Sequence, residues 1–221
     1  MAARPSSPWR RGRLLSFRSS PHGGAGERSP PGRSGGRGGA QLATARILAG
    51  GNHLITARPG EGKTTLIRRL ASRLADLAPC GFYTEELRRE GVRVGFRLVG
   101  LDGTEALLAH VELPGPRRVG RYGVDVKAFD AFLAGLATSG SPVLLVDEIG
   151  KMECLSAAFR GLVPRWLDGP AHVVATVAQR GEGLISDVKR RRDCELHELR
   201  RRGFDDLLEL LESAIRRGVG G

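Results

Sequence analysis

The 221-residue chain has no apolar run near the roughly 20 residues that a helix needs to cross a bilayer. Its strongly apolar segments are as short as "VLLV", residues 143–146. The three cysteines, Cys80, Cys154 and Cys194, lie far apart and form no CxxC or Cys/His pattern typical of a metal site. These absences predict a soluble protein in a reducing, cytoplasmic compartment, with no membrane partner.

Acidic residues are almost absent from the first 40 positions, where eight Arg accompany the single Glu27. Much of the formal net charge of +11 therefore lies in this segment, and 29 of its residues are Gly, Arg, Ser or Pro. Such a segment cannot bury enough apolar surface to fold, so we expect a disordered tail at 1–40 before one domain at 41–221. Its composition resembles an organelle transit peptide, and a mis-assigned start codon in a GC-rich gene would also yield it.

Aromatic residues are scarce near the basic clusters of the domain, residues 189–192 and 200–202, so bases would have little on which to stack. We interpret these clusters as solvated surface. Nucleic acid is therefore expected only as a non-specific partner of the tail, and the domain is expected to be a monomer.

Short apolar strands alternate with amphipathic helices from Asn52 onward, which is typical of an α/β domain with a largely parallel sheet flanked by helices. The expected strands lie at 53–57, 142–148 and 171–178, with an edge strand at 194–199. The expected helices lie at 64–78, 124–140, 155–167 with an interruption near Pro164, 184–191 and 204–217. Residues 81–112 are expected to form a small antiparallel β insert of three strands.

The segment "ARPGEGKT" resembles a phosphate-binding loop whose usual first glycine is replaced by Ala57. Gly60 and Gly62 allow successive backbone N–H groups to face phosphate oxygens, and the positive end of the following helix adds to the attraction. Lys63 supplies a mobile cation and Thr64 a hydroxyl for Mg²⁺. We expect the methyl group of Ala57 to be tolerated where the strand ends.

The predicted nucleotide contacts of this loop follow its whole length. They are Ala57, Arg58, Pro59, Gly60, Glu61, Gly62, Lys63, Thr64 and Thr65. An ordinary strand-to-helix turn with a solvated lysine is the alternative. The strand and the amphipathic helix on either side favour the phosphate loop, because the motif requires that setting.

A second part of the site is predicted where the apolar run of "PVLLVDEIGKMEC" ends in Asp147 and Glu148. Asp147 is predicted to hold Mg²⁺, generally through its water shell, and Glu148 to deprotonate the attacking water. Taken alone, the pair could be a strand followed by a polar helix cap. Together with Lys63, it favours nucleotide hydrolysis.

An acidic residue directly after the magnesium aspartate points to P-loop proteins with an additional strand between the two motif strands. That strand would be 171–178. Thr176 near its end is predicted to contact the terminal phosphate, with Gln179 as a weaker candidate. The alternative for Thr176 is a β-forming residue in a strand, without such a role. Arg191 is predicted to supply a further cation to the transition state, the alternative being a solvated surface arginine.

Several stretches together resemble the nucleoside-triphosphatase family that includes the cancer-related nucleoside-triphosphatase of animals and its bacterial and archaeal relatives. They occur in family order and are "RPGEGKTTL", "GFYTEELR", "VGFRLVGLDG", "VGRYGVDV", "LLVDEIGKMEC" and "VVATV". The resemblance implies a P-loop fold and Mg²⁺-dependent hydrolysis of ATP, GTP and other nucleoside triphosphates to the diphosphate and phosphate. The family's motif residues correspond to Gly60, Gly62, Lys63, Thr64, Asp147 and Glu148.

The resemblance also draws attention to two pairs of residues outside the main motifs. Glu85 and Glu86 would line the site, or be exposed charges of a hairpin. Arg121 and Tyr122 would contact phosphate or base, or form a loop with a packing tyrosine. The sequence contains no base-reading motif of the Asn/Thr-Lys-x-Asp type, so broad use of bases is expected.

Two other functions remain as alternatives. A nucleotide or small-molecule kinase would use the same phosphate loop, but it needs an acceptor pocket and a lid, for which only residues 179–193 are a candidate. A nucleotide-gated RNA-binding module would instead use the basic tail, and its affinity would fall steeply with ionic strength.

Overall fold

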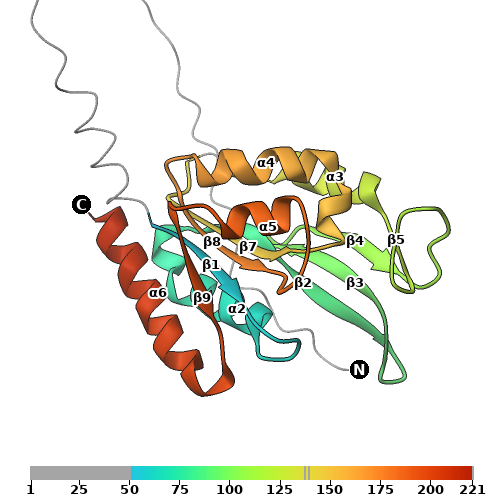
Figure 1. Ribbon diagram of the computed structural model, residues 1–221, viewed down its shortest axis with the longest axis horizontal. Coiled ribbons are helices and arrows are strands. Elements are labelled where there is room, and N and C mark those ends of the chain that lie inside the picture. The colour runs from blue at the N-terminus through green and yellow to red at the C-terminus, as the bar shows by residue number, and fades with distance from the viewer. Residues whose placement is uncertain (1–50, 137, 139, 221) are drawn as a thin grey trace, which may run out of the picture.

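In the part of the chain that the structure describes, nine strands join one sheet in the order β5-β6-β4-β3-β2-β7-β8-β1-β9 (Figure 1). The computed structural model describes residues 51–136, 138 and 140–220, so the predicted tail and the domain start at residue 41 lie outside the described residues. The strands are β1 (Asn52–Thr56), β2 (Cys80–Arg89), β3 (Val92–Gly100), β4 (Glu105–His110), β5 (Arg118–Val119), β6 (Tyr122–Val124), β7 (Val143–Ile149), β8 (His172–Val177) and β9 (Cys194–Glu198). The α-helices are α2 (Lys63–Arg73), α3 (Val126–Gly135), α4 (Ala157–Leu167), α5 (Leu184–Lys189) and α6 (Phe204–Val219).

Five strands, β2, β7, β8, β1 and β9, form the parallel part of the sheet. The three in its centre, β7, β8 and β1, are buried on both faces, which explains the apolar runs in β7 and β8. β8 pairs with both β1 and β7, so the predicted additional strand between the two motif strands is confirmed. The helices α3, α4 and α5 cover one face and α2 and α6 the other (Figure 1).

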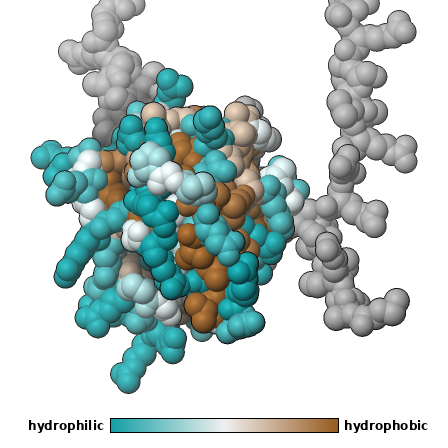
Figure 2. All heavy atoms as spheres, turned by 90° about the vertical axis from the view of Figure 1, so that its right-hand side faces the viewer, coloured by the Kyte–Doolittle hydropathy of each residue, from teal (hydrophilic) through white to brown (hydrophobic). Residues whose placement is uncertain are grey.

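The predicted antiparallel insert is an extension of the same sheet. The first residues of β2, Cys80–Phe82, pair in parallel with β7, whereas residues 82–89 of β2 pair antiparallel with β3. The sheet then continues through β4 to the short β5–β6 hairpin, which we did not predict because its strands have only two and three residues. Figure 2 shows this side of the molecule, where hydrophilic side chains surround a band of apolar residues.

The helix α4 is continuous through Pro164, so the predicted interruption is wrong. Proline removes one helical hydrogen bond and costs about 3 kcal/mol or more in a helix interior. Phe159, Val163 and Leu167 follow one another at four-residue spacing and are all buried against the sheet. Burial of each such side chain stabilises by about 1.5–3 kcal/mol, which offsets the cost of the proline.

Side-chain caps determine where two of the helices begin. Asp125 accepts a hydrogen bond from the backbone N–H of Ala128 at the start of α3, and Ser156 accepts one from Phe159 at the start of α4. Both helices are therefore shorter than their apolar patterns predicted. Within the described residues, no helix is both long enough and apolar enough to span a membrane.

Candidate active site

The carboxyl ends of β1, β7 and β8 meet at one edge of the sheet, because these strands are parallel. A cavity of about 520 Å³ opens there between the phosphate loop and β2. Eleven residues line it: Arg58, Gly60, Gly62, Lys63, Thr64, Thr65, Arg68, Thr84, Glu85, Glu86 and Glu148. The two segments predicted from separate motifs are thus brought together.

The backbone of the loop explains why Ala57 can replace the first glycine. Gly60 and Gly62 have φ angles of 82° and 100°, in the left-handed region that disfavours other residues. Ala57 is not among the residues with positive φ, and its methyl group is buried in the core beside Leu66 and Ile67. The loop therefore requires glycine at positions 60 and 62 but not at position 57.

The loop is supported from behind by the segment between β9 and α6. The backbone N–H of Arg201 donates to the Glu61 carboxylate at 2.9 Å. A Cβ atom at Gly62 would lie 3.3 Å from the ring of Phe204, the first residue of α6. The Glu61 side chain therefore faces the turn that leads into α6, and in this arrangement the predicted contact of Glu61 with nucleotide would come from its backbone.

Asp147 is the most enclosed carboxylate of the site, with 1% of its surface exposed. Thr64 and Thr84 donate hydrogen bonds to its Oδ2 atom at 2.6 and 3.3 Å, and Thr176 donates to Oδ1 at 2.6 Å. The three hydroxyls come from α2, β2 and β8, so three elements hold the carboxylate in one orientation. Thr84 was not predicted, although it stands directly before Glu85 in the "YTEE" stretch.

The structure gives Thr176 a different partner from the predicted one. Its side chain is fully buried, and its hydroxyl donates to Asp147. Thr176 does not line the cavity in this arrangement, and its predicted contact with phosphate stays a prediction. Gln179 lies beyond the end of β8, where its backbone carbonyl accepts a hydrogen bond from Lys189.

Lys63 and Glu148 form an ion pair, with Nζ and Oε2 3.0 Å apart. Lys63 is the first residue of α2, so the positive end of the helix dipole faces the same space. Glu148 is partly exposed and lines the cavity, whereas Asp147 is enclosed. The two adjacent carboxylates therefore have the different surroundings that a division of roles requires.

A third carboxylate, Glu153, lies close to this pair and was not predicted. It is buried, and a Cβ atom added at Gly150 would meet Glu153 Oε2 at 2.7 Å and Glu148 Oε1 at 3.2 Å. Burial, with the nearby charges of Glu148 and Asp147, raises the pKa of Glu153 to about 8. The burial of Glu153 could not be predicted from the "KMEC" sequence, because it depends on a short 3₁₀ turn at Glu153–Leu155.

Arg191 is not part of this site, which corrects the prediction. Its guanidinium pairs with Asp168 at 2.6 Å and Asp193 at 2.5 Å. Asp168 caps the end of α4, and Asp193 immediately precedes β9, so both lie toward the edge where the parallel strands begin. The error has a simple cause: α5 ends at Lys189, and Arg191 lies past the helix end.

Lys189 approaches the site in place of Arg191. Its Nζ donates to the carbonyl oxygens of Ala178 at 2.5 Å and Gln179 at 2.9 Å, just after the carboxyl end of β8. Burial lowers the pKa of Lys189, while the neighbouring charges of Glu148 and Lys63 act on it in opposite directions. Lys189 is therefore a second cation close to the Lys63–Glu148 pair.

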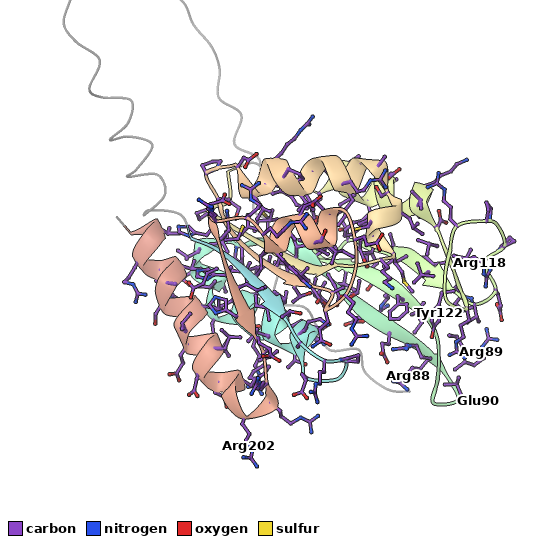
Figure 3. The ribbon with its side chains drawn as sticks, in the orientation of Figure 1. Arg88, Arg89, Glu90, Arg118, Tyr122 and Arg202 are labelled. Atoms are coloured by element: carbon purple, nitrogen blue, oxygen red, sulfur yellow. The ribbon has the colours of Figure 1, made fainter. Side chains whose placement is uncertain are left out.

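The remaining predicted residues separate into two groups. Glu85 and Glu86 both line the cavity; Glu85 pairs with Arg97 and Glu86 with Arg93. Tyr122 is buried, and its hydroxyl accepts a hydrogen bond from Arg93 at 3.1 Å, so it has the packing role. Figure 3 shows Tyr122 on the antiparallel side of the molecule with Arg88, far from Arg202 beside α6.

Arg121 contacts Tyr122 and does not line the cavity beside the phosphate loop. Its guanidinium lies over the Tyr122 ring, 5.2 Å from the centroid, and donates to the backbone carbonyl of Arg93. Neither residue lines the cavity. The alternative interpretation of this pair, a loop with a packing tyrosine, is the one that the structure supports.

Known proteins resemble the chain over almost all of the described residues. A family model described as NTPase matches residues 52–211. The chain is 40% identical over 166 residues to "Nucleoside-triphosphatase THEP1" of Thermotoga sp. (strain RQ2), covering 74% of this chain and 94% of the relative. It is 34% identical over 180 residues to "Cancer-related nucleoside-triphosphatase" of Homo sapiens, covering 73% and 95%.

A solved structure agrees with these relatives. The crystal structure of THEP1 from the hyperthermophile Aquifex aeolicus has a TM-score of 0.68 and 33% sequence identity, and covers 74% of this chain and 98% of that one. The predicted fold class, an α/β P-loop domain with a largely parallel sheet, is confirmed. The family model, the two relatives and the solved structure agree with the resemblance found in the motifs, and the chain therefore belongs to the NTPase family of nucleoside-triphosphatases.

Proposed function

We propose that the protein hydrolyses nucleoside triphosphates to the diphosphate and phosphate, with Mg²⁺ as its cofactor and with broad use of bases. One observation carries the proposal: a single cavity presents the glycine turns at 60 and 62, Lys63, Thr64 and Glu148, with Asp147 directly behind Thr64. Phosphate binding, metal binding and water activation each have a residue of suitable chemistry there.

The donor atoms of Thr64 and Asp147 fit Mg²⁺. Their oxygens lie 2.6 Å apart beside the phosphate loop, and Mg²⁺ prefers oxygen ligands, often with waters retained between ion and carboxylate. In this proposal, Thr64 and Asp147 would hold Mg²⁺, which would supply positive charge beside the phosphates. The hydrogen bonds from Thr84 and Thr176 keep the Asp147 carboxylate facing Thr64, so the protein needs little rearrangement when the metal enters.

The Lys63–Glu148 pair is the part that changes when the substrate binds. Phosphate oxygens compete for Lys63, because they carry more charge than one carboxylate. Glu148 then loses its cation and becomes free to accept a proton from water. The water oxygen attacks the terminal phosphorus, its proton passes to Glu148, and the bond to the diphosphate breaks with the electron pair on the leaving oxygen.

Lys189 supplies the further cation that the transition state needs, in place of Arg191. Its Nζ is held by the carbonyls of Ala178 and Gln179, on the same side as Glu148 and Lys63. Carbonyl groups hold a lysine less tightly than a carboxylate does, so this side chain can turn to the phosphate. A cation placed there stabilises charge that develops on the phosphoryl oxygens.

The test is phosphate release from a panel of ATP, GTP, CTP and UTP, with Mg²⁺ and with EDTA, using wild-type protein and Glu148→Gln. We expect all four to be hydrolysed within about a hundredfold of one another, only with metal, and poorly by the variant. Phosphate transfer to an added hydroxyl acceptor in place of release would instead establish a kinase. Turnover that requires RNA would establish the nucleotide-gated RNA-binding protein.

A further inference from the structure

Two histidines and a glutamate form a cluster on β1 and β9, away from the phosphate cavity. His53 is the second residue of β1 and is paired across the sheet with Glu195, while His197 is paired with Ile55. Alternate residues of a strand share a face, and cross-strand partners point to the same side. His53, Glu195 and His197 therefore lie together on the face covered by α6, at the edge strand of the sheet.

The distances within the cluster suit a metal ion. His53 Nδ1 lies 3.0 Å from His197 Nε2 and 3.7 Å from a carboxylate oxygen of Glu195, and His197 Nε2 lies 3.8 Å from the other. A tetrahedral Zn²⁺ ion with bonds of about 2.0–2.1 Å holds its ligand atoms about 3.4 Å apart. Small adjustments of three side chains would place all three atoms around one ion.

Both rings are largely enclosed, with side-chain exposures of 5% for His53 and 12% for His197. A neutral imidazole has a lone pair for a metal ion. Glu195 is 63% exposed at its side chain, so the cluster is open to water on one side, where an ion can enter.

A hydrogen bond between two neutral histidines is the simpler explanation, but it leaves features unexplained. One N–H···N bond satisfies both nitrogens without any carboxylate, yet the Glu195 oxygens approach both rings. His172, on the adjacent strand β8, is also buried, and its Nδ1 has no hydrogen-bond partner among the described residues. His172 stands two residues before Val174, the β8 partner of His53, so it shares that face of the sheet.

We propose that His53, His197 and Glu195 form a binding site for a divalent transition-metal ion of the Zn²⁺ class, separate from the Mg²⁺ site. The ligand types separate the two sites, because imidazole suits Zn²⁺ whereas the oxygens of Thr64 and Asp147 suit Mg²⁺. An ion there joins the edge strand β9 to β1. It therefore stabilises the attachment of the strand that leads into α6.

The test is Zn²⁺ binding to the full chain by calorimetry, with excess Mg²⁺ and nucleotide present to fill the phosphate site. We expect one Zn²⁺ per chain and a higher melting temperature with the ion. The edge-strand variants His197→Gln and Glu195→Gln are expected to weaken binding at least about tenfold while staying folded without metal. Co²⁺ binding, read by its visible absorption, reports whether nitrogen ligands hold the ion.

The matched control is His110→Gln. His110 also has a nearby carboxylate, with its Nδ1 3.8 Å from Glu112, but it has no second histidine beside it among the described residues. Cys194→Ser controls for the thiol next to Glu195 in the sequence. Both controls are expected to bind Zn²⁺ as the wild type does. No saturable binding by wild type, unchanged binding by His197→Gln, or loss of binding in Cys194→Ser would each overturn the proposed site.

Discussion

The two ends of the parallel strands hold polar side chains in different ways. At the carboxyl end, hydroxyls from three elements fix Asp147, and a helix N-terminus adds positive potential beside Lys63. Toward the amino end, His53 is held mainly by His197 on an edge strand. Strand direction thus separates the end that carries the glycine turns and Lys63 from the end where His53 lies near the start of β1. Changes at the first should alter turnover, and changes at the second should alter stability.

The largest effect at the carboxyl end is expected from Lys63→Ala. The variant loses the cation that faces the phosphates, so hydrolysis should fall about a hundredfold or more, while the melting temperature changes little. Phosphate release, nucleotide affinity and thermal melting measure the three quantities. Lys127→Ala, at an exposed lysine of α3, is the control. Near wild-type turnover in a folded Lys63→Ala protein would remove the phosphate loop from the mechanism.

A large but different effect is expected from Glu148→Gln. The amide keeps the shape of the side chain but cannot take the proton of water, so turnover should fall about 10²–10⁴-fold with nucleotide binding retained. Asp147→Asn should instead raise the Mg²⁺ concentration needed for activity, because the donor groups of three threonines face this side chain. Equal loss of nucleotide binding in both variants would contradict the division of roles.

The comparison of Lys189→Gln with Arg191→Gln sharpens the contrast between the two ends. Lys189 reaches the carboxyl end, so its loss should lower turnover about tenfold or more with little change in melting temperature. Arg191 pairs with Asp168 and Asp193, so its loss should lower stability by about 1 kcal/mol with turnover kept within about twofold. Exchange of the two outcomes would restore Arg191 as the phosphate cation.

Glu153 predicts how stability changes with pH in metal-free protein. The unfolded chain loses this proton near the ordinary pKa of 4.5, whereas the folded protein holds it to about 8. Between these values the folded state binds more protons, so stability falls as pH rises, by up to about 1.4 kcal/mol per pH unit, and levels off above pH 8. Denaturant unfolding in EDTA should show a flatter profile for Glu153→Gln. Parallel profiles would mean that this carboxyl is not the cause.

The smallest effect is expected from Ala57→Gly. The substitution restores the glycine that is usual at this position of the loop. It also adds backbone freedom to the unfolded chain and removes a buried methyl group, so stability should fall by about 0.5–1 kcal/mol. Turnover should stay within about twofold, because the φ angle of Ala57 already suits the loop. Enzyme assays and melting curves measure both quantities. A large gain in turnover would show that the alanine strains the phosphate loop.

The elements and the main motif residues could be predicted because their signals are local. The strands β7 and β8 contain short apolar runs, and β1 leads into the glycine-rich loop. Lys63 directly follows Gly62, and Glu148 lies near the end of β7. Contacts between distant segments could not be read in this way. Thr84 reaches Asp147 across 63 positions, and Lys189 is brought to the site only by the point at which α5 ends.

The contact between the phosphate loop and the segment leading into α6 has a consequence for cooperativity. Glu61 is bonded to the Arg201 backbone, and Gly62 lies against Phe204. The loop and the last helix therefore belong to one cooperative folding unit, although some 140 positions separate them. Ligand occupancy of the loop should slow amide exchange in α6, and fraying of that helix should reduce affinity for the nucleotide by the same free energy.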